Sequence, residues 1–116
     1  MDLTIKIYDS TFLYPKYLSN ENELHLFFTL WNDVHAKIVF KGVIAFYFCY
    51  IYCDAIGMRI TDNESEFLRS ALIYEYENIP QEHYFHCYEL LDIDDNPCTK
   101  IIAKDYDFLT NIELPE

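Results

Sequence analysis

The residues best suited to chemistry are histidines and cysteines. His83, His86 and Cys87 fall within five consecutive residues, and Cys49 and Cys53 lie in an apolar run. A structural zinc site needs four nitrogen or sulfur ligands in tetrahedral reach. On a strand, His83 and Cys87 share one face while His86 points to the other, and Cys49 and Cys53 are about 13 Å apart at ~3.3 Å per residue. We therefore expect no metal, and four reduced cysteines buried as small hydrophobic residues.

Other catalytic and cofactor patterns also fail. Cys87 beside His86 is a poor nucleophile and base pair, because neighbouring strand residues point to opposite faces. A calcium loop starting at Asp92 would place Pro97 where glycine is needed and Ala103 where glutamate is needed. The sequence has no glycine-rich phosphate loop and no basic patch. We therefore expect a protein that is not an enzyme, needs no cofactor and does not bind nucleic acid directly.

Nearly all of the net negative charge belongs to the second half of the chain. Residues 1–61 hold 6 acids and 5 bases, whereas residues 62–116 hold 14 acids and 3 bases. The net charge of -12 therefore divides into -1 and -11. Such a field repels lipid headgroups and nucleic acid and attracts basic partners.

We interpret residues 62–107 as a carboxylate and tyrosine surface that binds a basic protein. Tyrosine is a favoured interface anchor, and surrounding carboxylates steer association. The alternative is that the acids only increase solubility. A homodimer is a further alternative assembly. The predicted partner-binding residues are Glu75, Glu77, Glu82, Asp92, Asp94, Asp95, Tyr74 and Tyr84.

Length and composition indicate one domain spanning residues 1–116. The chain is 52% hydrophobic and 18% aromatic, which is enough to build a sizeable core. No basic start followed by an apolar segment indicates a secretory signal, so we expect a cytoplasmic protein whose cysteines stay reduced. The longest uninterrupted apolar stretch, residues 43–53, is shorter than the roughly 20 residues that a membrane helix needs.

The elements that would position these residues are mainly strands. β-Branched and aromatic residues over 36–53 predict a long central strand, buried on both faces and bent near Gly42. Residues 23–31 alternate and should form a hairpin with it. Further strands are expected over residues 3–8, 56–60, 83–93 and 99–106. Residues 9–22 are rich in turn-forming types and are expected to form a loop.

One segment has helical rather than strand spacing. Residues 67–76 carry apolar side chains at helical intervals, and Asn63 with Glu66 resembles a capping box. The spacing predicts a helix over 64–77, with a strand over 71–76 as the alternative. The fold class is therefore α+β, a curved antiparallel sheet of about five or six strands with one helix on one face.

The segment 37–43, followed by Ile56-Gly57-Met58, resembles the sheet of small acidic immunity proteins from bacterial polymorphic-toxin and contact-dependent inhibition systems. That resemblance implies a tight one-to-one complex with a basic toxin, often a nuclease, made in the same cell. It carries no individual binding residue over to this chain. Two alternatives stay open. One is a phage-type inhibitor that imitates DNA with its carboxylates, and the other is a small enzyme using the histidines and cysteines.

Overall fold

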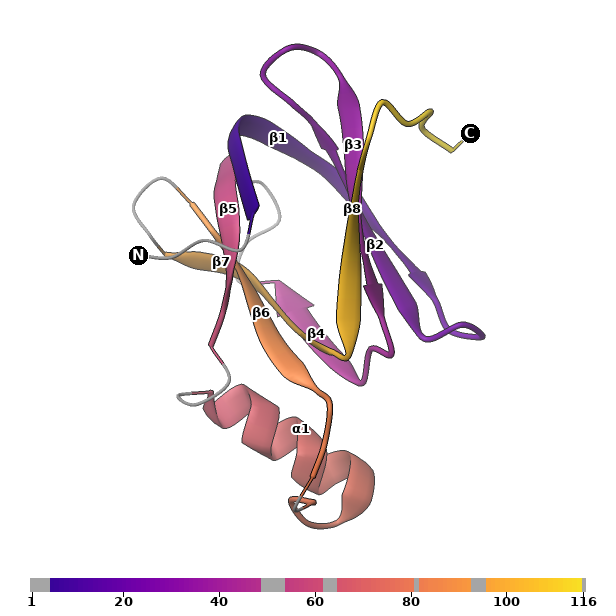
Figure 1. Cartoon of the computed structure of the whole chain (residues 1–116), viewed down its shortest axis with the longest axis vertical. Helices are drawn as coiled ribbons and strands as arrows, with labels where there is room; N and C mark the ends of the chain where they lie inside the picture. Colours follow the sequence, from indigo (N-terminus) through magenta and orange to yellow (C-terminus); the bar gives the residue numbers. More distant parts are fainter. Residues whose placement is uncertain (1–4, 49–53, 62–64, 81, 93–95, 116) are drawn as a thin grey trace.

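The computed structural model describes residues 5–48, 54–61, 65–80, 82–92 and 96–115. They form strands and one helix (Figure 1). In chain order the elements are β1 (Ile5–Leu18), β2 (Glu23–Thr29), β3 (His35–Lys41), β4 (Ala45–Phe48), β5 (Asp54–Ile60), α1 (Glu66–Tyr76), β6 (His86–Leu91), β7 (Pro97–Ala103) and β8 (Asp105–Thr110).

The strands form two four-stranded antiparallel halves joined by β1. The pairing order is β4-β7-β6-β5-β1-β2-β3-β8, and every neighbouring pair is antiparallel. The first part of β1, residues 5–11, pairs with β5, and residues 11–18 pair with β2. Because β1 belongs to both halves, it carries the chain from one to the other (Figure 1).

A second connection joins the halves at a bend in two neighbouring chain stretches. β3 pairs with β8 and β4 pairs with β7, so residues 35–48 and 97–110 run side by side in opposite directions. At the bend, the Lys104 amide donates to the Lys41 carbonyl at 2.9 Å, and the Ile44 amide donates to the Ile102 carbonyl at 3.0 Å. Gly42 has φ +65°, and a Cβ there would lie 2.9 Å from Lys104 Cγ. This close approach is the physical reason for glycine at the predicted bend.

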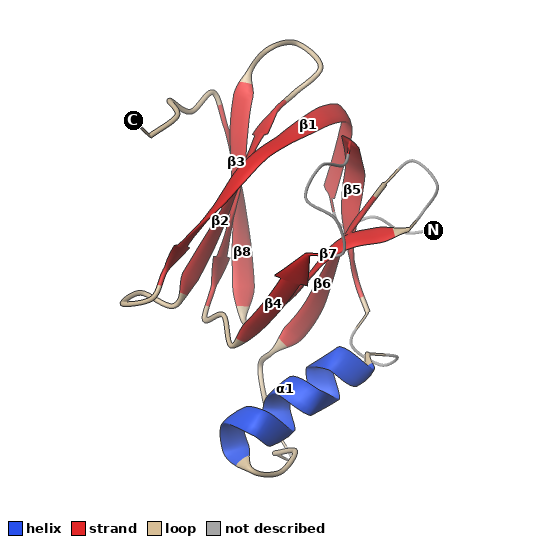
Figure 2. Ribbon diagram, turned by 180° about the vertical axis from the view of Figure 1, so that it is seen from behind, coloured by secondary structure: helices blue, strands red, loops and turns tan. Residues whose placement is uncertain are grey.

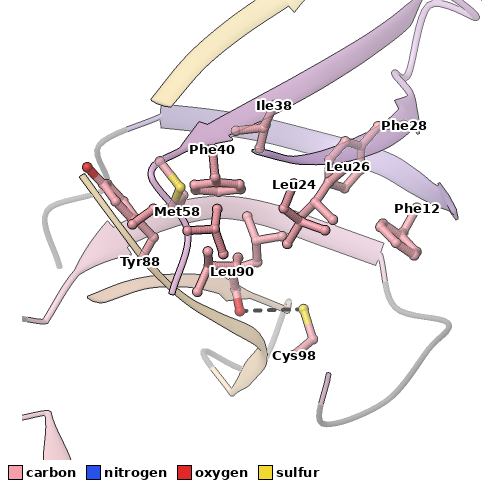
Figure 3. Packing of buried hydrophobic residues seen from close by; sticks show 13 residues of the cluster. Phe12, Leu24, Leu26, Phe28, Ile38, Phe40, Met58, Tyr88, Leu90 and Cys98 are labelled. Carbon is pink, nitrogen blue, oxygen red and sulfur yellow. Dashed lines mark hydrogen bonds between the residues drawn. The ribbon is translucent and has the colours of Figure 1, made fainter. Parts of the chain in front are cut away.

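The main core lies between the inner faces of the two halves (Figure 3). Strand alternation directs Leu24, Leu26 and Phe28 of β2 to the same side. At the junction, the Phe40 ring lies 5.4 Å from Tyr88 and 6.4 Å from Tyr106, measured between centroids. The other core residues include Ile38, Met58, Leu90, Cys98 and Ile101.

Helix α1 covers the outer face of the half that contains β6 and β7 (Figure 2). Ser65 caps its first turn, because the Ser65 hydroxyl accepts a 3.0 Å hydrogen bond from the Leu68 amide. Helical spacing places Leu68, Ala71 and Leu72 on one buried stripe. The stripe packs on Phe85, Cys87 and Ile102. The described residues contain no helix with the length and apolar character needed to cross a membrane.

The α+β class, the antiparallel strands and the single helix are confirmed. The strands expected over 23–31, 56–60 and 83–93 are also present, with observed bounds of 23–29, 54–60 and 86–91. The predicted number of five or six strands is only roughly matched by the eight observed. The difference arises at the bend, where β3 separates from β4 and β7 separates from β8. The strands consequently form two facing halves rather than one curved sheet.

The predicted loop over residues 9–22 is wrong, because β1 continues to Leu18. Turn-forming residues are accommodated within this strand. Pro15 pairs with Leu26, and the register shifts between Phe12 and Tyr14. The Tyr14 ring stacks on Phe27 at 4.8 Å. Aromatic packing therefore outweighs the local turn preference of the segment.

Two other expectations need correction. The helix begins at Glu66 with Ser65 as its cap, rather than at residue 64, and the predicted cap Asn63 lies outside the described residues. Residues 71–76 are helical, which removes the strand alternative. The central strand was expected to be buried on both faces. This expectation is wrong at β4, where Tyr47 is exposed and Phe46 is only partly buried. Residues 49–53 of that expected strand lie outside the described part of the chain.

Candidate functional site

The predicted partner-binding residues fall into two groups, and the first lies at the C-terminal end of α1. Tyr74 is 91% exposed, and Glu75 and Glu77 are exposed beside it. Glu77 ends the helix because its backbone adopts the left-handed conformation, with φ +66°. The helix end therefore presents its carboxylates, Tyr74 and part of Tyr76 to solvent.

The chain that leaves the helix brings Glu82 and Tyr84 close to this end. Both line a hollow of about 300 Å³. Phe85 belongs to the packing beneath α1, whereas Tyr84 is 75% exposed. Lys104 and His83 both line this hollow, and the Lys104 ammonium lies 5.4 Å from the centroid of the Phe85 ring. The lining residues are Tyr76, Pro80, Glu82, His83, Tyr84, Phe85 and Lys104.

Exposed apolar side chains are concentrated in this same region. Ten large hydrophobic residues are exposed in the described part of the chain, and five of them lie between residues 73 and 84. Three glutamates are interleaved with them and are also exposed. We call this region the α1-end surface, and it consists of Ile73, Tyr74, Glu75, Tyr76, Glu77, Ile79, Glu82 and Tyr84.

The second predicted group lies elsewhere. Asp92 follows the far end of β6, where its carboxylate accepts a 2.9 Å hydrogen bond from the Asn96 amide. β6 begins near the α1-end surface at His86, so Asp92 is about 20 Å farther along the strand at ~3.3 Å per residue. Asp94 and Asp95 lie outside the described residues. The predicted residues that the structure describes therefore do not form one continuous patch around α1, because Asp92 lies apart from the others.

Sequence reasoning missed a second hollow, at the N-terminal end of α1. This polar cavity has a volume of about 550 Å³ and lies between the first turn of the helix and strands β4 to β7. Glu89 projects into it from β6, although this residue is only 4% exposed. The Glu89 carboxylate pairs with Arg59 Nε at 3.0 Å and with Lys100 Nζ at 3.1 Å. The remaining lining residues are Tyr47, Thr61, Ser65, Glu66 and Phe67.

Strand register explains why these three charges meet. Glu89 is directly opposite Arg59 on β5 and Lys100 on β7. Partial burial alone would lower the pKa of Lys100, but hydrogen bonding and charge attraction from Glu89, followed by Tyr47, raise it above its ordinary value. The sequence signal was a charged residue among apolar neighbours in each of three strands. Without the register, those charges could not be matched.

The histidines and cysteines form no comparable site within the described ranges. Cys87 and Cys98 are fully buried. The Cys98 thiol donates to the Leu90 carbonyl at 3.5 Å (Figure 3). Among the residues that the structure describes, no group of three or more histidine, cysteine or acidic side chains is arranged to hold a metal ion. Cys49 and Cys53 lie outside those residues.

Comparison with protein-family models, with curated proteins and with solved structures yields no match for this chain.

Proposed function

We propose that this chain is a non-enzymatic binding protein that recognises a basic protein partner through the α1-end surface. The observation that carries the proposal is the concentration there of half of the large hydrophobic residues that are exposed in the described part of the chain, interleaved with three exposed glutamates. Exposed apolar patches with a polar rim are typical of protein interfaces. Tyrosines at the centre of such a patch commonly supply much of the binding energy.

Charge supports a basic partner over an acidic one. Residues 62–116, which contain the whole α1-end surface, carry a net charge of -11. Glu75, Glu77 and Glu82 would guide a basic protein toward the exposed tyrosines. The hollow beside Tyr84 offers a place for one side chain of the partner. Lys104 would disfavour a basic side chain of the partner at that position and would favour an aromatic one.

The most specific form of the proposal is an immunity protein that neutralises a basic bacterial toxin, such as a nuclease, inside the producing cell. Its support is the acidic, aromatic-rich chain and the resemblance of residues 37–43 and 56–58 to the sheets of such proteins. In this form, the α1-end surface covers a basic substrate-binding region of the toxin and thereby blocks it.

The test uses the partner recovered from the source cell by the full-length chain and then purified. Association and dissociation rates are measured for the wild type and for the triple variant Glu75→Gln, Glu77→Gln, Glu82→Gln. We expect slower association and a weaker salt dependence for the variant, because charges that steer encounter have been removed. Screening limits such steering to about 8 Å at physiological ionic strength.

The matched control neutralises three exposed acids elsewhere, by Glu21→Gln, Asp33→Asn and Glu113→Gln. It changes net charge equally but leaves the α1-end surface intact. Equal slowing by both triple variants would mean that only net charge matters, and would overturn the proposed surface. A third variant with Asp92, Asp94 and Asp95 replaced by asparagine tests the distant acids separately.

A further inference from the structure

We propose that the polar cavity at the N-terminal end of α1 binds a small ligand through an anionic oxygen group, either a carboxylate or a phosphate. This inference is independent of the proposed partner surface, because the two hollows lie at opposite ends of the helix and share no lining residue. It rests on how the charges and hydroxyl groups around the cavity are already engaged.

Both oxygens of the buried carboxylate are already engaged by cations. Glu89 Oε1 binds Arg59 Nε, and Glu89 Oε2 binds Lys100 Nζ. Arg59 and Lys100 together carry two positive charges, and Glu89 balances one of them. Arg59 and Lys100 keep side-chain exposures of 32% and 26%, so both remain accessible from the cavity. Glu66 also lines the cavity, but it is exposed and therefore well solvated.

Several hydrogen-bond donors line the cavity beside the two carboxylates of Glu66 and Glu89. The arginine and lysine side chains can only donate, and each hydroxyl group can donate one proton. The Ser65 hydroxyl already accepts a hydrogen bond from the Leu68 amide, so its own proton remains available for another acceptor. The positive end of the α1 dipole lies at the same place. A ligand rich in acceptor oxygens would complement this set of groups.

A buried hydroxyl on the wall points to the same kind of ligand. Thr61 Oγ1 is shielded from solvent and has no hydrogen-bond partner among the described residues. Its backbone is held in place, because the Thr61 amide donates to the Cys87 carbonyl at 2.9 Å. An acceptor could reach Oγ1 only after the Thr61 side chain turns toward the cavity, and its binding would then remove the free-energy cost of a buried polar atom without a partner.

Two aromatic rings give the cavity a fixed wall. The Tyr47 and Phe67 rings meet edge to face, with centroids 4.8 Å apart and an interplanar angle of 82°. Phe67 follows the helix cap and Tyr47 comes from β4, so this wall joins α1 to the sheet. It would contact the apolar part of a ligand whose anionic group faces Arg59 and Lys100.

The test is a two-dimensional NMR titration of the full chain with inorganic phosphate and, separately, with acetate, at constant ionic strength maintained by sodium chloride. We expect saturable shifts of the Thr61, Phe67 and Lys100 amides with at least one of the two anions. Saturation with phosphate alone identifies a phosphate site, and saturation with acetate alone identifies a carboxylate site. Shifts that do not saturate, or that spread over the molecule without concentrating at the cavity, overturn the proposal.

Two variants and a control distinguish the site from general ion binding. Thr61→Val keeps the side-chain shape and removes the hydroxyl, and we expect roughly fivefold weaker binding. The double variant Arg59→Gln, Lys100→Gln removes both cations while the glutamine amides can still donate to Glu89, and we expect at least roughly tenfold weaker binding. Arg69→Gln removes an exposed cation of α1 that does not line the cavity, and its binding should equal that of the wild type.

Equal affinity in the wild type and Thr61→Val, or equal weakening by Arg69→Gln and the double variant, would contradict the assigned site. Thr61→Val keeps the test decisive if the double variant does not fold, because it leaves every ion pair in place.

Discussion

Replacing Phe40 by alanine should reveal whether the two strand halves share one core. The Phe40 side chain is fully buried and lies between Tyr88 of one half and Tyr106 of the other. A buried phenylalanine removes about 150–250 Å² from water, which at ~25 cal/mol per Å² is at most roughly 4–6 kcal/mol. Measured phenylalanine truncations in cores cost about 3–5 kcal/mol, and we expect this range for Phe40→Ala.

The assay is urea unfolding followed by both circular dichroism and tyrosine fluorescence. Domains of this size are stable by roughly 6–17 kcal/mol at ~0.05–0.15 kcal/mol per residue, so the expected loss is readily measured. Phe46→Ala is the matched control, because Phe46 is the same residue type but only partly buried on β4. Its cost should be smaller, about 1–2 kcal/mol.

The reasoning would be refuted if Phe40→Ala cost no more than Phe46→Ala. Separate transitions by the two probes in the wild type would equally contradict a single shared core, because the halves would then unfold independently.

Three further perturbations test local features of the fold. Ser65→Ala removes the helix cap and should cost about 0.5–2 kcal/mol in urea melts, whereas Ser65→Asp should retain most of the stability. Gly42→Ala places a side chain at φ +65° and close to Lys104, so it should cost at least ~1 kcal/mol; an unchanged melt would refute the need for glycine there. Stability should fall as the pH rises from about 9 to about 11. Burial would lower the pKa of Lys100, but Glu89 and Tyr47 raise it above its ordinary value. The pKa of Tyr106 is raised by burial and by Asp105. The unfolded chain therefore releases both protons at a lower pH than the folded chain does. Tyr106→Phe should weaken that alkaline dependence, and a urea midpoint that rises with pH would contradict it.

Local patterns predicted the elements whose burial follows one simple period. Leu24, Leu26 and Phe28 alternate along β2 and are all buried. The helix was predicted from apolar spacing, and Leu68, Ala71 and Leu72 indeed form its buried stripe. Gly42 was also informative, because a lone glycine in an apolar strand indicates a bend or a close approach.

The features that sequence reasoning missed depend on partners distant in the chain. β1 continues through turn-forming residues because Tyr14 stacks on Phe27 of the next strand. The ion pairs of Glu89 require β5, β6 and β7 to be aligned in a register that no local pattern specifies. The candidate partner-binding residues were selected by charge and composition. The structure brings Tyr74, Glu75, Glu77, Glu82 and Tyr84 to one end of α1, and it places Asp92 at the far end of β6.

Site-specific photocrosslinking in the source cell tests the proposed docking surface most directly. A photoreactive phenylalanine analogue is introduced at Tyr74 or Tyr84, with Trp31 as the control because it is 72% exposed at the β2–β3 turn, away from α1. We predict that the analogue at Tyr74 and at Tyr84 crosslinks to the same basic protein, and that the analogue at Trp31 does not. Crosslinking of that protein at Trp31 but at neither tyrosine would contradict the account.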